Sequence, residues 1–77
     1  MNNQETVFDK NKFASLLKRA KGSRTITKYA EESGVSASHI SRLLRGLLDT
    51  APSPEIISKL ATKAYSNVSY KDLLNAA

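Results

Sequence analysis

The sequence predicts an all-α fold of five short helices in one domain, and three observations support this prediction. Five segments begin with a residue whose side chain is well suited to cap a helix N-terminus. Inside these segments, apolar residues recur at the spacing of one helix face. No alternation of apolar and polar residues is long enough to indicate a β-strand. Because the 77 residues include no cysteine, the fold has to depend on a small apolar core rather than on disulfide bonds.

The first predicted helix begins after the N-cap Asp9 and ends near Ala20, just before Gly22. Phe8 before the cap and Phe13 after it have the spacing of a hydrophobic staple, which fixes the direction from which the chain enters a helix. The stripe expected to face the core comprises Phe13, Leu16, Leu17 and Ala20.

The second and third predicted helices are separated by a short turn. Thr25 is the expected N-cap of the second helix, and Gly34 ends it by supplying a left-handed backbone conformation that other residues adopt only at a cost. Ser36 then caps a third helix, expected over residues 37–45, and Gly46 ends this helix in the same way.

The fourth and fifth predicted helices follow a connector. Ser53, Pro54 and Glu55 form a strong helix start, with a hydroxyl cap, a proline at the first helical position and an acid near the positive end of the helix dipole. Ser69 caps the last helix, and Asp72 occupies the capping-box position three residues later.

We expect residues 1–8 to form a flexible N-terminal segment and residues 9–77 to form the single domain. Because the sequence stops shortly after two leucines, without a polar tail, we also consider that this domain is the N-terminal part of a longer protein. The chain has no apolar run of about 18 residues and no signal-peptide pattern, so the expected location is the cytoplasm, without a membrane segment.

Charge is distributed unevenly along the chain. The formal net charge is +5, and the stretch from Lys10 to Lys28 contains seven basic residues and no acidic one. This pattern favours a polyanionic partner, which the basic side chains attract electrostatically. The alternative is a lysine-rich surface that is simply solvated.

The segment from Ile26 to Arg45 has the organisation of a helix-turn-helix, two short helices joined by a tight turn. Ala30 is small enough for the two helices to approach closely, and Gly34 permits the turn. The apolar contacts expected to fix the angle between the helices come from Val35, Ile40 and Leu43.

Residues 25–46, with the sequence TITKYAEESGVSASHISRLLRG, resemble the Xre family of repressor/Cro-type (phage lambda repressor-like) helix-turn-helix domains. Residues 52–61 and 69–74 resemble the fourth and fifth helices of that family, so the resemblance covers most of the chain. It implies a compact five-helix DNA-binding domain that regulates transcription, more often as a repressor. Two positions depart from the family pattern: Ile26, where glutamine often holds a phosphate, and Ser33, where a bulky apolar residue is usual.

The helix predicted over residues 37–45 suits the major groove. Its apolar back contains Ile40 and Leu43, its front is basic and hydroxylic, and it carries no acid. An arginine such as Arg42 can hold guanine with two hydrogen bonds, although a solvated surface charge is the alternative. Base contacts are predicted for Ala37, Ser38, Ser41 and Arg42, the first two because they match family positions that touch bases. Phosphate contacts are predicted for Thr25, Thr27, Lys28, Ser36, His39 and Arg45.

The expected partners are double-stranded DNA with a near-palindromic operator and a second copy of the chain. The last helix and the connector residues Leu47 and Leu48 are candidate dimer contacts, although both leucines equally suit the core. One histidine, no cysteine and no facing carboxylates predict no enzyme activity, catalytic residue, cofactor or metal. The main alternative function is a protein-interaction module, such as an antitoxin or adaptor, with the same fold.

Overall fold

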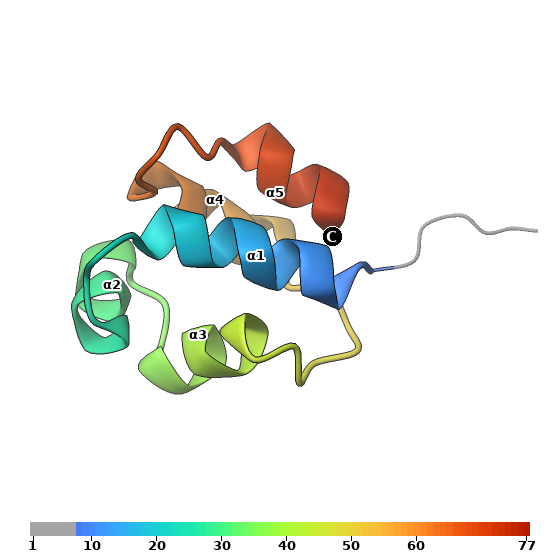
Figure 1. The fold of residues 1–77 in the computed structure, drawn as a ribbon, viewed down its shortest axis with the longest axis horizontal. Coiled ribbons are helices and arrows are strands. Elements are labelled where there is room, and N and C mark those ends of the chain that lie inside the picture. The colour runs from blue at the N-terminus through green and yellow to red at the C-terminus, as the bar shows by residue number, and fades with distance from the viewer. Residues whose placement is uncertain (1–7) are drawn as a thin grey trace, which may run out of the picture.

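The computed structural model describes residues 8–77, which form five α-helices and no strand (Figure 1). The predicted all-α class is therefore confirmed. The helices are α1 (Lys10–Lys21), α2 (Ile26–Ser33), α3 (Ala37–Leu44), α4 (Pro54–Thr62) and α5 (Tyr70–Ala76). The expected N-terminal segment 1–8 lies outside the described residues except for Phe8. The third helix ends one residue earlier than predicted, with Arg45 as its C-cap.

Every helix begins at the residue that the sequence predicted as its N-cap. In each case the side-chain oxygen of the cap accepts a hydrogen bond from the backbone N–H three residues later, which satisfies one of the donors left free in the first helical turn. The last helix has a complete capping box, in which Ser69 N–H also donates to the Asp72 carboxylate. The caps are Asp9, Thr25, Ser36, Ser53 and Ser69.

The two glycines around α3 end their helices through different hydrogen bonds. Gly34 adopts a left-handed conformation (φ 80°, ψ 17°), and its N–H donates to the Ala30 carbonyl at 2.9 Å. At Gly46 (φ 66°) the bond spans one residue more, because Leu47 N–H donates to the Arg42 carbonyl at 3.0 Å. The turn at Gly34 precedes α3 and the turn at Gly46 follows it, so the two glycines limit the length of this helix.

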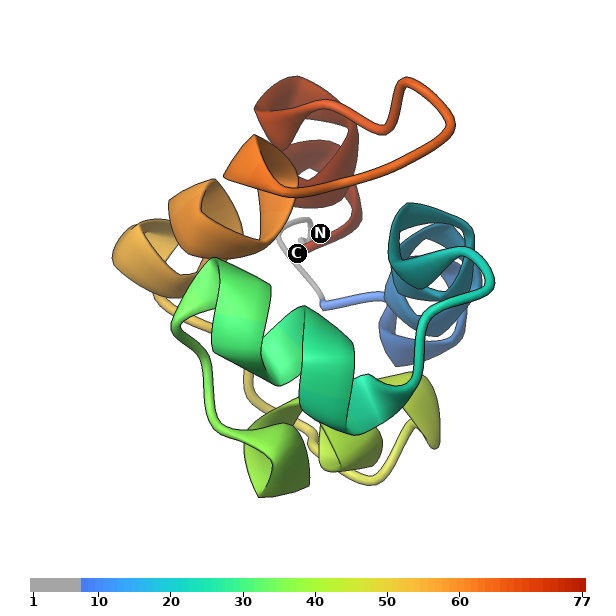
Figure 2. The same ribbon diagram turned by 90° about the vertical axis from the view of Figure 1, so that its left-hand side faces the viewer.

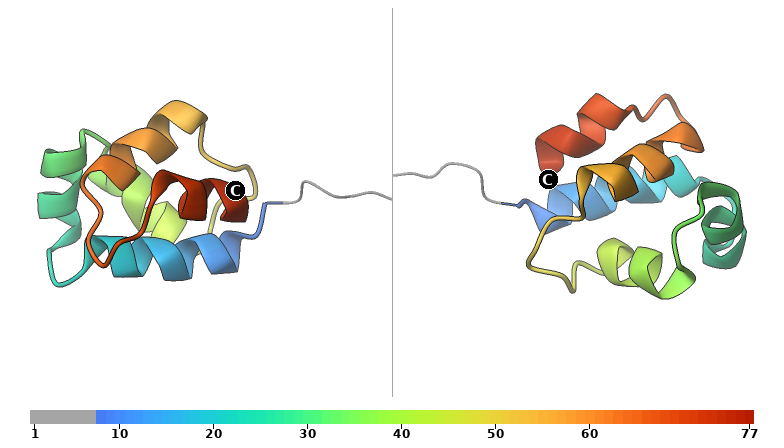
Figure 3. Two further views of the ribbon diagram at one scale, coloured as in Figure 1. Left: turned by 90° about the horizontal axis from the view of Figure 1, so that it is seen from above. Right: turned by 180° about the vertical axis from the view of Figure 1, so that it is seen from behind.

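The position of α1 organises the domain. This helix packs against α3 on one side and against α5 on the other, while α2 contacts α3 and α4. Figure 2 shows α3 at the bottom and α5 at the top, with α1 and α4 between them and α2 in front. The view from behind in Figure 3 shows the same separation. The outward surfaces of α3 and α5 therefore lie on opposite sides of the domain.

The core combines side chains from all five helices. Phe8 packs edge-on against Phe13, with 5.6 Å between the ring centroids, as expected for the predicted staple. The connector leucines differ, because Leu47 is 57% exposed whereas Leu48 packs against the core. Within residues 8–77, no helix is both long and apolar enough to cross a membrane. The largest fully buried side chains are Tyr29, Phe13, Leu17, Ile40, Leu43, Ile57, Leu60 and Leu73.

Candidate nucleic-acid interface

The turn between α2 and α3 depends on the unusual Ser33. This side chain is buried, and its hydroxyl accepts a hydrogen bond from Val35 N–H at 3.3 Å. A serine in this position stabilises a turn through its own backbone contact, where an apolar residue would contribute only packing. Val35 itself enters the core at the start of α3. The departure from the expected apolar residue therefore supplies a turn contact and leaves the helix-turn-helix geometry intact.

The two faces of α3 have contrasting environments. Ile40 and Leu43 are buried in the core, whereas Ser38, Arg42 and Arg45 are exposed. At about 100° per residue, the three exposed side chains fall within roughly 60° of arc. Residues 36–45 include no acidic side chain, so the outward face offers only hydrogen-bonding groups and positive charge.

The N-termini of α2 and α3 offer a second kind of contact. Thr25 Oγ1 accepts a hydrogen bond from Lys28 N–H at 3.0 Å, and Ser36 Oγ accepts one from His39 N–H at 3.2 Å. A hydroxyl that accepts such a bond still has its own proton to donate. Capping and phosphate contact are therefore compatible for both residues. The positive end of each helix dipole adds to the attraction for an anion.

The structure places the predicted contact residues at two levels of exposure. Seven of them are exposed: Thr25, Thr27, Lys28, Ser36, Ser38, Arg42 and Arg45. Three are half-buried: Ala37, His39 and Ser41. All ten belong to the first turn of α2, to α3 or to the caps of these helices, so they occupy neighbouring elements. Ile26, the residue that replaces the common glutamine, packs partly against the core.

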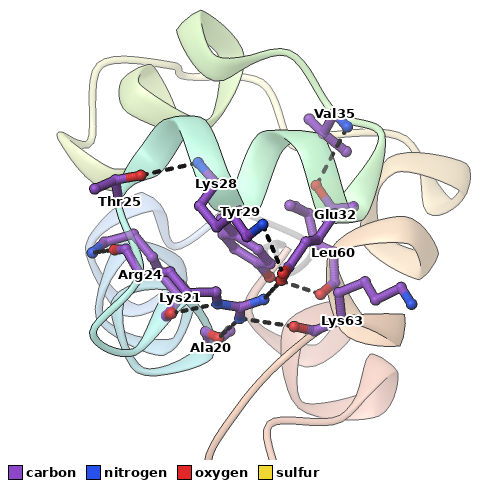
Figure 4. Close-up of polar contacts among 11 residues, drawn as sticks. Ala20, Lys21, Arg24, Thr25, Lys28, Tyr29, Glu32, Val35, Leu60 and Lys63 are labelled. Atoms are coloured by element: carbon purple, nitrogen blue, oxygen red, sulfur yellow. Dashed lines mark hydrogen bonds and ion pairs between the residues drawn. The ribbon is translucent and has the colours of Figure 1, made fainter.

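Sequence reasoning missed the role of Arg24, which it counted only as part of the basic run. The Arg24 side chain is 7% exposed, and its guanidinium donates hydrogen bonds to three backbone carbonyls (Figure 4). Nη2 bonds to Ala20 O at 2.6 Å and to Lys63 O at 2.8 Å, and Nε bonds to Lys21 O at 2.9 Å. A basic residue just after a helix C-terminus often bonds to the last carbonyls of that helix, and that signal was available in the sequence.

Two aromatic rings flank the same guanidinium. Its central carbon lies 3.6 Å from the ring centroid of Tyr65 and 4.4 Å from that of Tyr29. The Tyr29 hydroxyl donates to the Leu60 carbonyl at 2.7 Å, and burial raises the pKa of Tyr29 to about 12. Arg24 therefore joins the end of α1, the middle and end of α2 and the end of α4.

Glu32 brings an acidic group close to the interface. Its carboxylate lies one helical turn beyond Lys28, with Oε2 3.9 Å from Lys28 Nζ. The other oxygen, Oε1, lies 2.6 Å from Arg24 Nη1. Two cations therefore share this carboxylate, and the buried arginine makes the closer contact.

The surface of α2 and α3 presents polar and positively charged side chains. In the described part of the chain, no three His, Asp or Glu side chains lie close enough together to hold a metal ion. No pocket opens on the surface of residues 8–77.

Comparison with known proteins adds one finding. A family model described as helix-turn-helix matches residues 17–63, more than half of the chain, and the matched segment contains α2, the turn, α3 and α4. Searches of curated proteins and of solved structures gave no match.

Proposed function

The chain belongs to the Cro/C1-type, Xre-like helix-turn-helix family of DNA-binding domains, and from this premise we propose that it is a sequence-specific regulator of transcription. In this proposal α3 enters the major groove of double-stranded DNA and reads the edges of the bases. The protein acts in a prokaryote or a phage, as a repressor.

The observation that carries the proposal is the exposed face of α3. Ser38, Arg42 and Arg45 project from it, while Ile40 and Leu43 anchor the opposite face in the core. Arg42 is the proposed guanine-reading residue, because its guanidinium can bond to O6 and N7 together. The other proposed base contacts are Ala37, Ser38 and Ser41.

Phosphate contacts fix the orientation of the helix in the groove. We assign them to the hydroxyls of Thr25 and Ser36 at two helix N-termini, and to Lys28 and Arg45 beside them. Thr27 and His39 complete the proposed set. All except His39 are exposed, which supports contact with the DNA backbone.

We also propose that the protein binds as a homodimer to a near-palindromic operator. One domain of this size makes few base contacts, so a second copy is the usual way to gain specificity. The surface offers apolar groups for such a contact, since Leu47, Tyr70 and Leu74 are exposed. The last two lie on α5, away from α3.

The proposal is tested by selecting bound sequences from random duplex DNA at low and moderate salt. Enrichment of a short inverted repeat, with affinity that falls steeply as salt rises, is the expected result. If the folded protein enriches no sequence and shows no salt-dependent binding, the proposal is wrong and a protein-interaction module becomes the better assignment.

A further inference from the structure

The carboxylate of Glu32 is the acidic group closest to a proposed phosphate contact. Lys28 and Glu32 are four residues apart on α2 and therefore lie on the same helix face. Their charged atoms are 3.9 Å apart, and the lysine side chain is 58% exposed. An acid in this place can hold the lysine away from DNA, and it repels a phosphate directly.

Arg24 counteracts both effects without touching DNA. It approaches Glu32 to 2.6 Å, closer than Lys28 does, and only 7% of its side chain is exposed. Three of its other N–H donors are bonded to the carbonyls of Ala20, Lys21 and Lys63, so the guanidinium is fixed in place. When Lys28 leaves for a phosphate, the Glu32 carboxylate still has its stronger partner.

We infer, on the basis of the proposed function, that Arg24 is a positioning residue for DNA binding: it neutralises Glu32 and thereby frees Lys28 to bind a phosphate. Figure 4 shows the three side chains together, with the Arg24 guanidinium below the charged ends of Lys28 and Glu32. The two cations therefore have different roles: the buried Arg24 neutralises the Glu32 carboxylate, and the exposed Lys28 binds the phosphate.

The test is a double-mutant cycle measured by DNA affinity. Arg24→Gln and Glu32→Gln are made singly and together, and each protein is titrated with the duplex selected by the wild type. Glu31→Gln is the matched control, since Glu31 is exposed on the same helix and its replacement changes the net charge equally. Circular dichroism establishes that each variant is folded at the temperature of the titration.

Arg24→Gln is expected to weaken binding by about fivefold, the effect of one well-formed surface ion pair. Glu32→Gln is expected to restore most of that loss in the Arg24→Gln protein, and to change the affinity of the wild type by less than about twofold. Glu31→Gln should change the affinity by the same factor in both backgrounds. The restoration should disappear when Lys28→Ala is added, because the effect is exerted through this lysine.

The inference is overturned if Glu32→Gln has the same effect with and without Arg24, or if Glu31→Gln shows equal coupling. A wild-type protein that binds no duplex at low salt identifies failure of the proposed function instead. If Arg24→Gln does not fold, the cycle is repeated with Arg24→Lys. Lysine keeps the positive charge, but its single ammonium group cannot bond to Glu32 and to the three carbonyls in the way that the planar guanidinium does. A smaller coupling of the same sign is then expected, and zero coupling contradicts the inference.

Discussion

The guanidinium of Arg24 lies over the ring of Tyr65, with its central carbon 3.6 Å from the ring centroid. The same ring covers Gly22, where an added Cβ would lie 2.6 Å from Tyr65 Cδ2. Tyr65 N–H also donates to the Ala20 carbonyl at 2.8 Å. The chain after α4 is thus attached directly to the end of α1, through a contact that requires the absence of a side chain at residue 22.

Gly22→Ala should destabilise the protein by about 2 kcal/mol, because the backbone conformation (φ 65°, ψ −141°) is strained for alanine and the new methyl group meets Tyr65. Urea unfolding followed by circular dichroism measures the change. Gly34→Ala is the control, since Gly34 also has a positive φ but no atom lies within 4 Å of its added Cβ. This control should cost about 1 kcal/mol, the backbone penalty alone. Equal losses for the two variants would show that the contact with Tyr65 is unimportant.

Ser36→Ala and Ser69→Ala should each reduce the free energy of unfolding by about 1 kcal/mol, because each removes an N-cap hydrogen bond. Only Ser36→Ala should also weaken DNA binding, since α5 lies on the side of the domain opposite α3 (Figure 2). Denaturant unfolding and DNA titration are measured for both proteins. Equal DNA affinities of the two variants would remove Ser36 from the proposed interface.

Arg42→Ala and Lys28→Ala should weaken DNA binding in different ways. The arginine variant should lose preference at one base position, by about 1–3 kcal/mol, because a bidentate base contact is lost. The lysine variant should weaken binding to all sequences about equally and reduce the salt slope by about one. Repeating the sequence selection with each variant distinguishes these results. An even loss for Arg42→Ala over all sequences would contradict its assigned role.

The buried Tyr29 predicts a loss of stability in alkaline solution. Burial raises its pKa to about 12 from the ordinary tyrosine value of 10.0, so the unfolded chain releases the proton at a lower pH than the folded protein does. The stabilisation is present below about pH 10 and is lost as the pH rises toward 12.

Tyr29→Phe is the control for this effect. It removes the titrating group and leaves the Leu60 carbonyl without its hydrogen-bond donor, so the variant should be less stable at neutral pH. Its stability should fall less steeply than that of the wild type between about pH 10 and 12. The same slope for both proteins would show that Tyr29 does not cause the alkaline loss.

The local parts of this structure could be predicted from the sequence, whereas some of the tertiary contacts could not. Helix starts follow from short-range chemistry, so Asp9 and Ser69 identified their helices directly. The roles of Leu47 and Leu48 depend on how the connector turns after Gly46, and apolar character alone does not distinguish an exposed leucine from a packed one.

Arg24 shows the same limit for the candidate site. Its partners include Lys63 and Tyr65, which are distant in sequence, so its burial depends on how the chain after α4 packs against the end of α1. The exposed face of α3 was predictable because helix periodicity alone separates Arg42 from Ile40. The DNA contacts assigned to that face stay predictions.

The placement of α1 between α3 and α5 has a consequence for how such a domain can diversify. In the proposed assignment, a substitution on the outer surface of α5 alters the contact between two copies of the chain, while the residues of α3 proposed to enter the groove keep their positions. In the same assignment, a substitution at Ser38 or Arg42 changes base preference and leaves α5 unaltered. If both assignments hold, selection can adjust target choice and oligomerisation separately, because α1 lies between the two helices.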